Sequence, residues 1–117
     1  MQHQKRYCLA LDLKDDPAII REYEAHHRSV SPEIQKSIRD AGITVMDIYR
    51  VGNRLFMIME VDETFSFERK EAMDAANEKV QVWEKLMSEY QQELPFAGQG
   101  EKWMLMKQIF ALDPEQK

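Results

Sequence analysis

The chain is poor in the residues and segments that build disulfide-stapled, secreted or membrane-spanning proteins. Its 117 residues include one cysteine, Cys8, so an intrachain disulfide is excluded. No apolar run reaches membrane-spanning length, and no signal-peptide pattern opens the chain. We therefore expect a cytoplasmic protein without a membrane partner, in which Cys8 is a small buried hydrophobe of a strand.

Cationic clusters and cofactor motifs are also lacking. The net charge is −5, and the lysines and arginines form no run, which argues against nucleic acid as a partner. The sequence contains no P-loop, dinucleotide fingerprint, zinc-spaced cysteines or nucleophile elbow. These absences favour chemistry without a metal or organic cofactor, or no chemistry at all.

Histidine is scarce, but two of the three histidines are adjacent in the stretch EYEAHHRSVSPEI, residues 22–34. A helix would place Tyr23 and His27 on one face, one turn apart. A phenol and an imidazole projecting together could serve as proton donor and acceptor near neutral pH. Spacing alone equally fits a core tyrosine and a solvated histidine at a helix end. His26 lies about 100° round the helix, on the face shared by Glu22, and a metal pair of these two has no third ligand nearby in sequence.

Hydrophobic periodicity divides the chain into strand, two helices, two strands, two helices and a final strand. The predicted strands span residues 6–13, 43–51, 54–62 and 102–112, and the predicted helices span 17–28, 32–41, 66–76 and 78–92. Asp16 and Ser31 each precede a proline, the cap-then-proline signal of a helix start. The pair Gly52-Asn53 predicts a tight hairpin. No repeat or second domain interrupts residues 1–117, and residues 112–117 are expected to form a loose tail.

This element order predicts an α+β fold: a ferredoxin-like, four-stranded antiparallel sheet with helices on one face. The strand over 54–62 carries bulky apolar side chains on both of its faces: Leu55, Met57, Met59 and Val61 on one, Phe56 and Ile58 on the other. One layer of helices covers only one face of the sheet. The other face is therefore expected to line a pocket or to be buried by a second subunit, which favours a homodimer.

An apolar stripe follows the predicted helix over 78–92, with Val80, Trp83, Met87 and Tyr90 at spacings of three and four. Core packing accounts for most of these side chains. One exposed aromatic face would suit a sugar, whose C–H side packs on a ring while its hydroxyls take polar partners. Glu84 is then either a solvated surface residue or such a partner.

The order of these features resembles the L-rhamnose mutarotase family, and more closely its members linked to L-fucose. The resemblance covers nearly the whole chain and is carried by RYCLALDLKDDP, EYEAHHRSVSPEI, DIYRVGNRLFMIMEVD, FSFERKEAMDAANEKVQVWEKLM, YQQELP and GEKW. It implies a small ferredoxin-like homodimer of the dimeric α/β-barrel type. Such a protein interconverts the α and β anomers of a 6-deoxyhexose without metal or organic cofactor.

The resemblance also implies site residues. The family's helical tyrosine and the histidine one turn later fall on Tyr23 and His27, which are the expected catalytic pair. Its sugar-contacting aromatic position falls on Trp83. Ser31 and Glu84 stand where rhamnose-type members often carry tryptophan, and we treat both as expected substrate-binding positions. The Trp83-Glu84 pair is similar to the fucose-linked members, whereas Ser31 departs from them, and L-fucose is favoured over L-rhamnose.

Two other functions fit the same scaffold, because a fold does not fix a function. One is a cofactor-free monooxygenase, which would consume oxygen with an electron-rich aromatic substrate and ignore sugars. The other is a non-catalytic dimeric ligand-binding module, which would bind a sugar without changing its anomer exchange.

Overall fold

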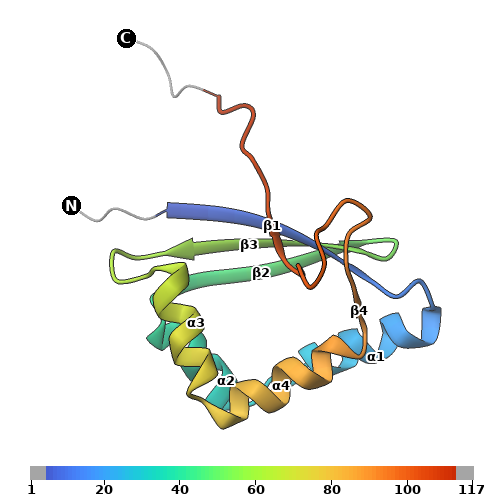
Figure 1. Ribbon diagram of the computed structural model, residues 1–117, viewed down its shortest axis with the longest axis horizontal. Helices are drawn as coiled ribbons and strands as arrows, with labels where there is room; N and C mark the ends of the chain where they lie inside the picture. The colour runs from blue at the N-terminus through green and yellow to red at the C-terminus, as the bar shows by residue number, and fades with distance from the viewer. Residues whose placement is uncertain (1–4, 113–117) are drawn as a thin grey trace.

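The computed structural model describes residues 5–112, so the predicted tail lies outside this range except for Leu112. A sheet and a set of helices form two layers (Figure 1). In chain order the elements are β1 (Lys5–Leu13), α1 (Pro17–His27), α2 (Pro32–Asp40), β2 (Ile43–Val51), β3 (Arg54–Val61), α3 (Phe67–Ala75), α4 (Glu78–Ser88), β4 (Gln91–Gln92) and β5 (Met104–Leu105).

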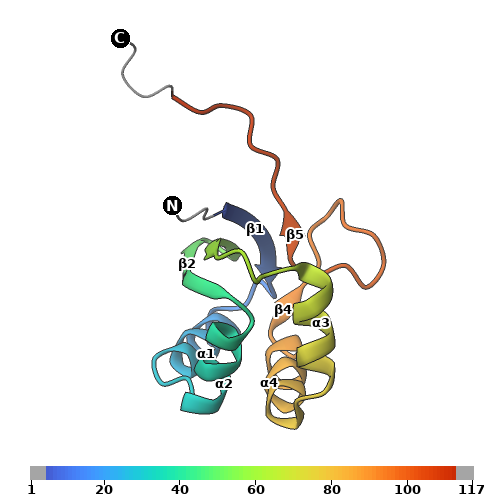
Figure 2. The ribbon, with the colours of Figure 1, turned by 90° about the vertical axis from the view of Figure 1, so that its left-hand side faces the viewer.

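The strands of the sheet run in the order β2-β3-β1-β4, and β5 also pairs with β1. Every pairing is antiparallel. The helices lie against one face of the sheet in two columns, α1 with α2 and α3 with α4 (Figure 2). The predicted α+β architecture, an antiparallel sheet with helices on one face, is therefore confirmed.

The helix starts and the hairpin form where the local signals predict them. The Asp16 carboxylate accepts a hydrogen bond from the Ala18 N–H at 2.8 Å, and Pro17 opens α1. At the hairpin between β2 and β3, Gly52 has a φ of +58°, whereas Asn53 has no positive φ. A positive φ at only the first central residue is the type II′ pattern, which matches the twist of the two strands.

The core lies between the sheet and the helices. Alternate side chains of β1 and β3 point into it and are buried: Leu9, Leu11, Leu13, Leu55, Met57, Met59 and Val61. Full burial of one such side chain contributes about 1.5–3 kcal/mol. One buried cluster joins Leu13 and Leu55 of the sheet to Tyr23 of α1 and Met87 of α4. This cluster fixes the relative positions of α1 and α4, the two helices that carry the expected site residues.

The opposite face of the sheet, here called the outer face, carries no helix (Figures 1 and 2). Phe56 and Ile58 are only half-buried there. Cys8 points to the same face and is partly exposed, so the expectation of a buried cysteine was wrong. The alternation of β1 places Cys8 away from Leu9, on the side that no helix covers.

Two predicted elements are shorter than expected. The helix predicted over 78–92 ends at Ser88, because the chain turns so that the Tyr90 carbonyl accepts a hydrogen bond from the Lys14 N–H at 2.9 Å. Residues 91–92 then form β4 instead. Of the strand predicted over 102–112, only Met104–Leu105 pairs with β1.

Residues 106–112, here called the C-terminal arm, leave the body of the molecule in an extended path (Figures 1 and 2). The Met106 N–H donates to the Cys8 carbonyl at 2.7 Å, close to the point where the arm departs. The arm belongs to the strand predicted over 102–112, but a strand also needs a hydrogen-bonded neighbour. The sequence of the segment does not reveal whether the same chain supplies that neighbour.

Candidate active site

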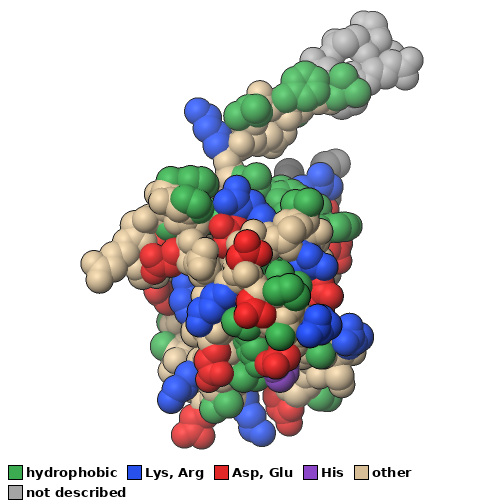
Figure 3. All heavy atoms as spheres, turned by 90° about the vertical axis from the view of Figure 1, so that its right-hand side faces the viewer, with side chains coloured by type: hydrophobic (Ala, Val, Ile, Leu, Met, Phe, Trp, Pro, Cys, Tyr) green, Lys and Arg blue, Asp and Glu red, His purple; other side chains and the backbone are tan. Residues whose placement is uncertain are grey.

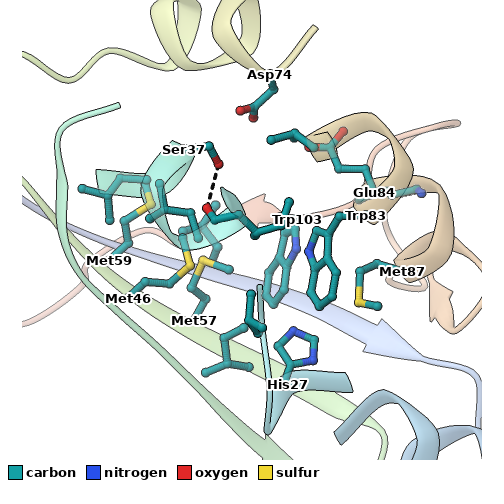
Figure 4. Close-up of a pocket in the computed structure, with 18 of the residues that line it drawn as sticks. His27, Ser37, Met46, Met57, Met59, Asp74, Trp83, Glu84, Met87 and Trp103 are labelled. Carbon is teal, nitrogen blue, oxygen red and sulfur yellow. Dashed lines mark hydrogen bonds between the residues drawn. The ribbon is translucent and has the colours of Figure 1, made fainter. Parts of the chain in front are cut away.

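The main cavity lies between the inner face of the sheet and the helices. Its walls come from α1, α2, α3, α4, the three long strands and the segment over 101–105. Its lining residues include Tyr23, His27, Trp83 and Trp103. Figure 4 shows His27 at one end of this cavity, the two tryptophans in the middle, and Asp74 and Glu84 at the other end.

One hydrogen bond sets which ring nitrogen of a neutral His27 carries the hydrogen. Its Nδ1 lies 2.9 Å from the backbone carbonyl oxygen of Tyr23, one turn earlier in α1. A carbonyl oxygen can only accept, so Nδ1 must carry the hydrogen and Nε2 of the neutral ring is left with its lone pair. In the part of the chain that the structure describes, no protein group hydrogen-bonds to Nε2. The half-buried imidazole therefore offers a basic nitrogen at the cavity wall.

Tyr23 lies beside His27, with ring centroids 4.5 Å apart. It is 3% exposed and belongs to the core cluster, yet it also lines the cavity. Burial raises the pKa of Tyr23, while a hydrogen bond from Gln91 Nε2 to the Tyr23 hydroxyl oxygen, at 3.4 Å, acts to lower it. The phenol therefore stays protonated at neutral pH. Because Gln91 donates to it, the tyrosine keeps its own hydrogen for an acceptor in the cavity.

Two tryptophans contribute indole surfaces to the wall of the cavity. Trp83 of α4 is half-buried and meets His27 edge-on, with ring centroids 5.3 Å apart. Trp103, just before β5, packs against both core clusters and stands next to Trp83 in the cavity (Figure 4). Flat indole surfaces of this kind can hold the C–H face of a sugar ring. Trp83, an expected sugar-contacting residue, lines the cavity, and so does Trp103, which belongs to the strand predicted over 102–112.

Charged groups gather at the end of the cavity away from His27. Glu84 of α4 lines the wall, and partial burial of its carboxyl group, followed by the negative charge of Asp74, raises the pKa of Glu84. Asp74 and Lys70, both of α3, form an ion pair whose side chains are 13% and 25% exposed. This end combines hydrogen-bond acceptors and a cation inside a partly desolvated space.

Ser31 does not line the cavity, although Ser29 and Val30 do. Its hydroxyl oxygen accepts a hydrogen bond from the Ile34 N–H at 3.4 Å and so caps α2. The local helix start therefore accounts for the hydroxyl of Ser31, and the cavity wall near it is supplied by its neighbours.

His26 has a partner of its own on the other side of α1. Its Nε2 lies 3.1 Å from the hydroxyl of Tyr90, which donates to a carboxylate oxygen of Glu22 at 3.2 Å. This chain explains why His26 is half-buried instead of freely solvated. Among residues 5–112, no group of three or more histidine, cysteine, aspartate or glutamate side chains is arranged to hold a metal ion.

Sequence reasoning missed Gln91, Trp103 and the Lys70–Asp74 pair as wall residues. Gln91 reaches Tyr23 because β4 folds back beside β1, which no local pattern predicts. The apolar stripe of α4 gave no signal for Trp103, because this residue lies outside α4. The spacing of Lys70 and Asp74 does predict an ion pair on a helix, but not that the pair faces a cavity.

The described residues include no helix long and apolar enough to cross a membrane. Residues 6–112 match the family model of L-rhamnose mutarotase. The L-fucose mutarotase of Xanthomonas campestris pv. campestris is 44% identical over 110 residues, covering 92% of this chain and 88% of that protein. A UPF0734 protein of Dictyostelium discoideum is 34% identical over 117 residues, covering 93% of this chain and 90% of that protein.

Solved structures with the same fold are more distant in sequence. The L-rhamnose mutarotase of Formosa agariphila superposes with a TM-score of 0.67 at 20% identity, covering 93% of this chain and 99% of that one. The tetracenomycin F2 cyclase of Streptomyces glaucescens gives 0.61 at 14% identity, covering 95% and 99%. A dimeric ferredoxin-like protein from an uncultured marine organism gives 0.52 at 12% identity, covering 97% and 95%. These likenesses confirm the ferredoxin-like fold, and the cyclase illustrates that different chemistry uses it.

Proposed function

This chain belongs to the L-rhamnose mutarotase family, and we propose that it interconverts the α and β anomers of a 6-deoxyhexose, with L-fucose preferred over L-rhamnose. Mutarotases are isomerases that act on carbohydrates. The observation that carries the proposal is the free Nε2 of His27 beside the protonated Tyr23, at the wall of a cavity with indole surfaces. This arrangement supplies a base, an acid and an apolar platform for a sugar ring.

The proposed reaction opens and recloses the pyranose ring. His27 Nε2 removes the proton of the anomeric hydroxyl, the bond between C1 and the ring oxygen breaks, and the Tyr23 hydroxyl protonates that oxygen. The open-chain aldehyde then rotates about its C1–C2 bond. Ring closure reverses the transfers: the C5 hydroxyl returns a proton to Tyr23 while its oxygen attacks C1, and His27 returns its proton to the new anomeric oxygen.

The surroundings of the two groups suit these transfers. The carbonyl of Tyr23 holds Nδ1–H of His27, so the imidazole keeps one tautomer and gains a stabilised positive charge when Nε2 is protonated. Gln91 donates to the Tyr23 hydroxyl oxygen and so stabilises the phenolate that forms during opening. Each positioned proton transfer contributes roughly 10²–10⁴-fold in rate.

The preference for L-fucose is supported by the relative of 44% identity, which is named for that sugar. It is also supported by Glu84 next to Trp83, where a polar acceptor replaces a second indole and leaves room and hydrogen-bonding capacity for a hydroxyl. Ser31 takes no direct part in this proposal, because its hydroxyl caps α2.

The test is anomer exchange followed by NMR on L-fucose and L-rhamnose, with and without the protein. We expect faster exchange on both sugars and a higher kcat/KM on L-fucose. Equal values, or a higher value on L-rhamnose, would remove the substrate preference but keep the activity. Sugar binding in calorimetry with unchanged exchange would favour a binding module instead, and oxygen uptake with an aromatic substrate would favour a monooxygenase.

We further propose that the protein works as a homodimer in which a second copy covers the outer face of the sheet. Half-buried Phe56 and Ile58 and the exposed ring of Tyr49 form an apolar area on this face. The C-terminal arm adds more apolar surface, and hydrophobic side chains are visible along it (Figure 3). Ile109 is 89% and Phe110 73% exposed. A monomer would leave both surfaces in water, whereas a second copy can bury them together.

A further inference from the structure

The Lys70–Asp74 ion pair is more deeply buried than is usual for an ion pair on the surface of a helix. Its two side chains are only 25% and 13% exposed, and both residues line the main cavity. The next helix is tied to this point, because Gln81 Nε2 donates to the backbone carbonyl of Asp74 at 2.8 Å. The carboxylate is therefore held in a fixed place on the cavity wall, not on a mobile surface turn.

Several carboxylate oxygens at this end of the cavity accept no hydrogen bond from the described protein residues. Lys70 engages Oδ2 of Asp74, and no hydrogen bond from residues 5–112 reaches Oδ1 or the two carboxylate oxygens of Glu84. Partial burial, followed by the charge of Asp74, raises the pKa of Glu84, while the charges of Lys70 and Lys102 act to lower it. Free acceptors beside a cation in a partly desolvated wall suit a neutral ligand with several hydroxyl groups.

The position of this pair relative to His27 limits which hydroxyls it can meet. Figure 4 shows Asp74 and Glu84 at one end of the cavity and His27 at the other, with the two indoles between them. A pyranose whose anomeric carbon C1 lies at His27 directs C4, the ring atom opposite C1, toward the far end. The hydroxyls on C3 and C4 are therefore the ones that approach Asp74 and Glu84.

From this geometry we infer that Asp74, held by Lys70 and assisted by Glu84, is a specificity-determining residue that binds the O3/O4 hydroxyl pair of the sugar. The inference rests on the proposed mutarotase function. In L-fucose O3 and O4 lie on the same side of the ring, whereas in L-rhamnose they lie on opposite sides. A carboxylate fixed in one place can accept hydrogen bonds from both hydroxyls only when they lie on the same side of the ring. The subsite therefore gives a physical reason for a preference between the two sugars.

The experiment compares L-fucose with 6-deoxy-L-glucose, which differs from it only in the orientation of O4. We expect the wild-type protein to prefer L-fucose. In Asp74→Asn, kcat/KM on L-fucose should fall about 10- to 100-fold, as for a lost hydrogen bond to a charged group, while the value on the epimer changes much less. Glu84→Gln should change the ratio in the same direction. Glu63→Gln removes the same charge from an exposed residue that does not line the cavity and should leave the ratio unchanged.

The outcomes separate the two levels of the proposal. If the wild-type protein accelerates neither sugar, the proposed function fails. If it accelerates L-fucose and a folded Asp74→Asn variant keeps the wild-type ratio of kcat/KM values, the activity stands and this inference is overturned. Should Asp74→Asn not fold, as judged by circular dichroism, the ratio measured for Glu84→Gln decides. A merely structural role would lower the activity on both sugars alike and leave the ratio where it was.

Discussion

At the scale of single residues, two adjacent histidines have different tasks because their ring nitrogens meet different partners. His27 turns Nδ1 to a carbonyl in its own helix, so its other nitrogen is available in the cavity. His26 lies on another side of α1 and places its Nε2 against the Tyr90 hydroxyl. Substituting one histidine or the other therefore separates a proposed chemical role from a packing role in the same stretch of chain.

Tyr23→Phe tests the proposed acid. Phenylalanine fills the same space in the core and gives up only the 3.4 Å hydrogen bond from Gln91, so the fold should be kept. Without the phenolic proton, kcat for anomer exchange should fall roughly 10²-fold or more. The measurement is NMR exchange at saturating L-fucose, and a kcat within a few-fold of wild type would assign the acid role elsewhere.

The burial of Tyr23 also predicts how stability changes at alkaline pH. Burial raises its pKa above the ordinary value of about 10, so the folded protein holds this proton more tightly than the unfolded chain does. The corresponding stabilisation is complete below about pH 10 and is lost as the pH rises through the folded pKa. Urea unfolding at neutral and strongly alkaline pH should show a smaller loss of unfolding free energy in Tyr23→Phe than in the wild type. An equal loss in both proteins would mean that the phenol is not desolvated.

Residue-level prediction succeeded where a pattern is local. The four-residue spacing puts Tyr23 and His27 side by side, and their rings do lie 4.5 Å apart. The hydrogen bond that selects the tautomer of His27 depends on the exact direction of the ring, which spacing does not contain. Gln91 reaches Tyr23 across 68 residues of chain, so only the folded arrangement reveals it.

At the scale of elements, N-cap residues mark where the helices start. The C-terminal ends of the helices were harder to predict from the sequence. Asp16 and Ser31 cap α1 and α2 as expected, and Ser66 and Asn77 cap α3 and α4 in the same manner. The end of α4 is decided by the bond from Lys14 to the Tyr90 carbonyl, which comes from a distant strand. The apolar stripe continues past Ser88 and so predicts a longer helix than the one that forms.

The turn before β2 gives an element-scale prediction. Gly42 has a φ of +98°, and a Cβ there would lie 2.7 Å from both the Asp62 Oδ1 and the Thr64 Oγ1 atoms. Gly52 has a φ of +58° and an open surrounding. Gly52→Ala should cost about 1–2 kcal/mol of unfolding free energy for the left-handed backbone alone, and Gly42→Ala should cost more because it adds a steric clash. Chemical denaturation checks this order, and equal or reversed costs would contradict it.

At the scale of the whole molecule, the sheet has one face covered by helices and one face without them (Figure 2). The two-sided apolar pattern of β3 predicted that the sheet has a second apolar face without helices. This prediction was possible because the pattern is local in the sequence. The sequence did not predict that residues 106–112 leave the sheet. The apolar residues of this segment are compatible with a strand, but a strand forms only where a neighbouring strand supplies its hydrogen bonds.

Removal of the C-terminal arm tests the proposed homodimer. Light scattering after gel filtration should give the full chain a mass twice its 13.9 kDa. A variant ending at Leu105 loses the apolar side chains of the arm and should shift toward the monomer, whereas a variant ending at Leu112 keeps them and should remain dimeric. A monomeric full-length protein would contradict the homodimer. A variant ending at Leu105 that is dimeric at every concentration would restrict the interface to the outer face.

The most direct test of the whole account is the rate of exchange between the α and β anomers of L-fucose, measured by NMR with the wild-type protein, His27→Ala and His26→Ala. We predict that the wild type accelerates exchange, that His27→Ala returns the rate to that of the sugar alone, and that His26→Ala retains most of the acceleration. Acceleration that survives in His27→Ala, or a wild-type protein that leaves the exchange rate unchanged, would contradict the account.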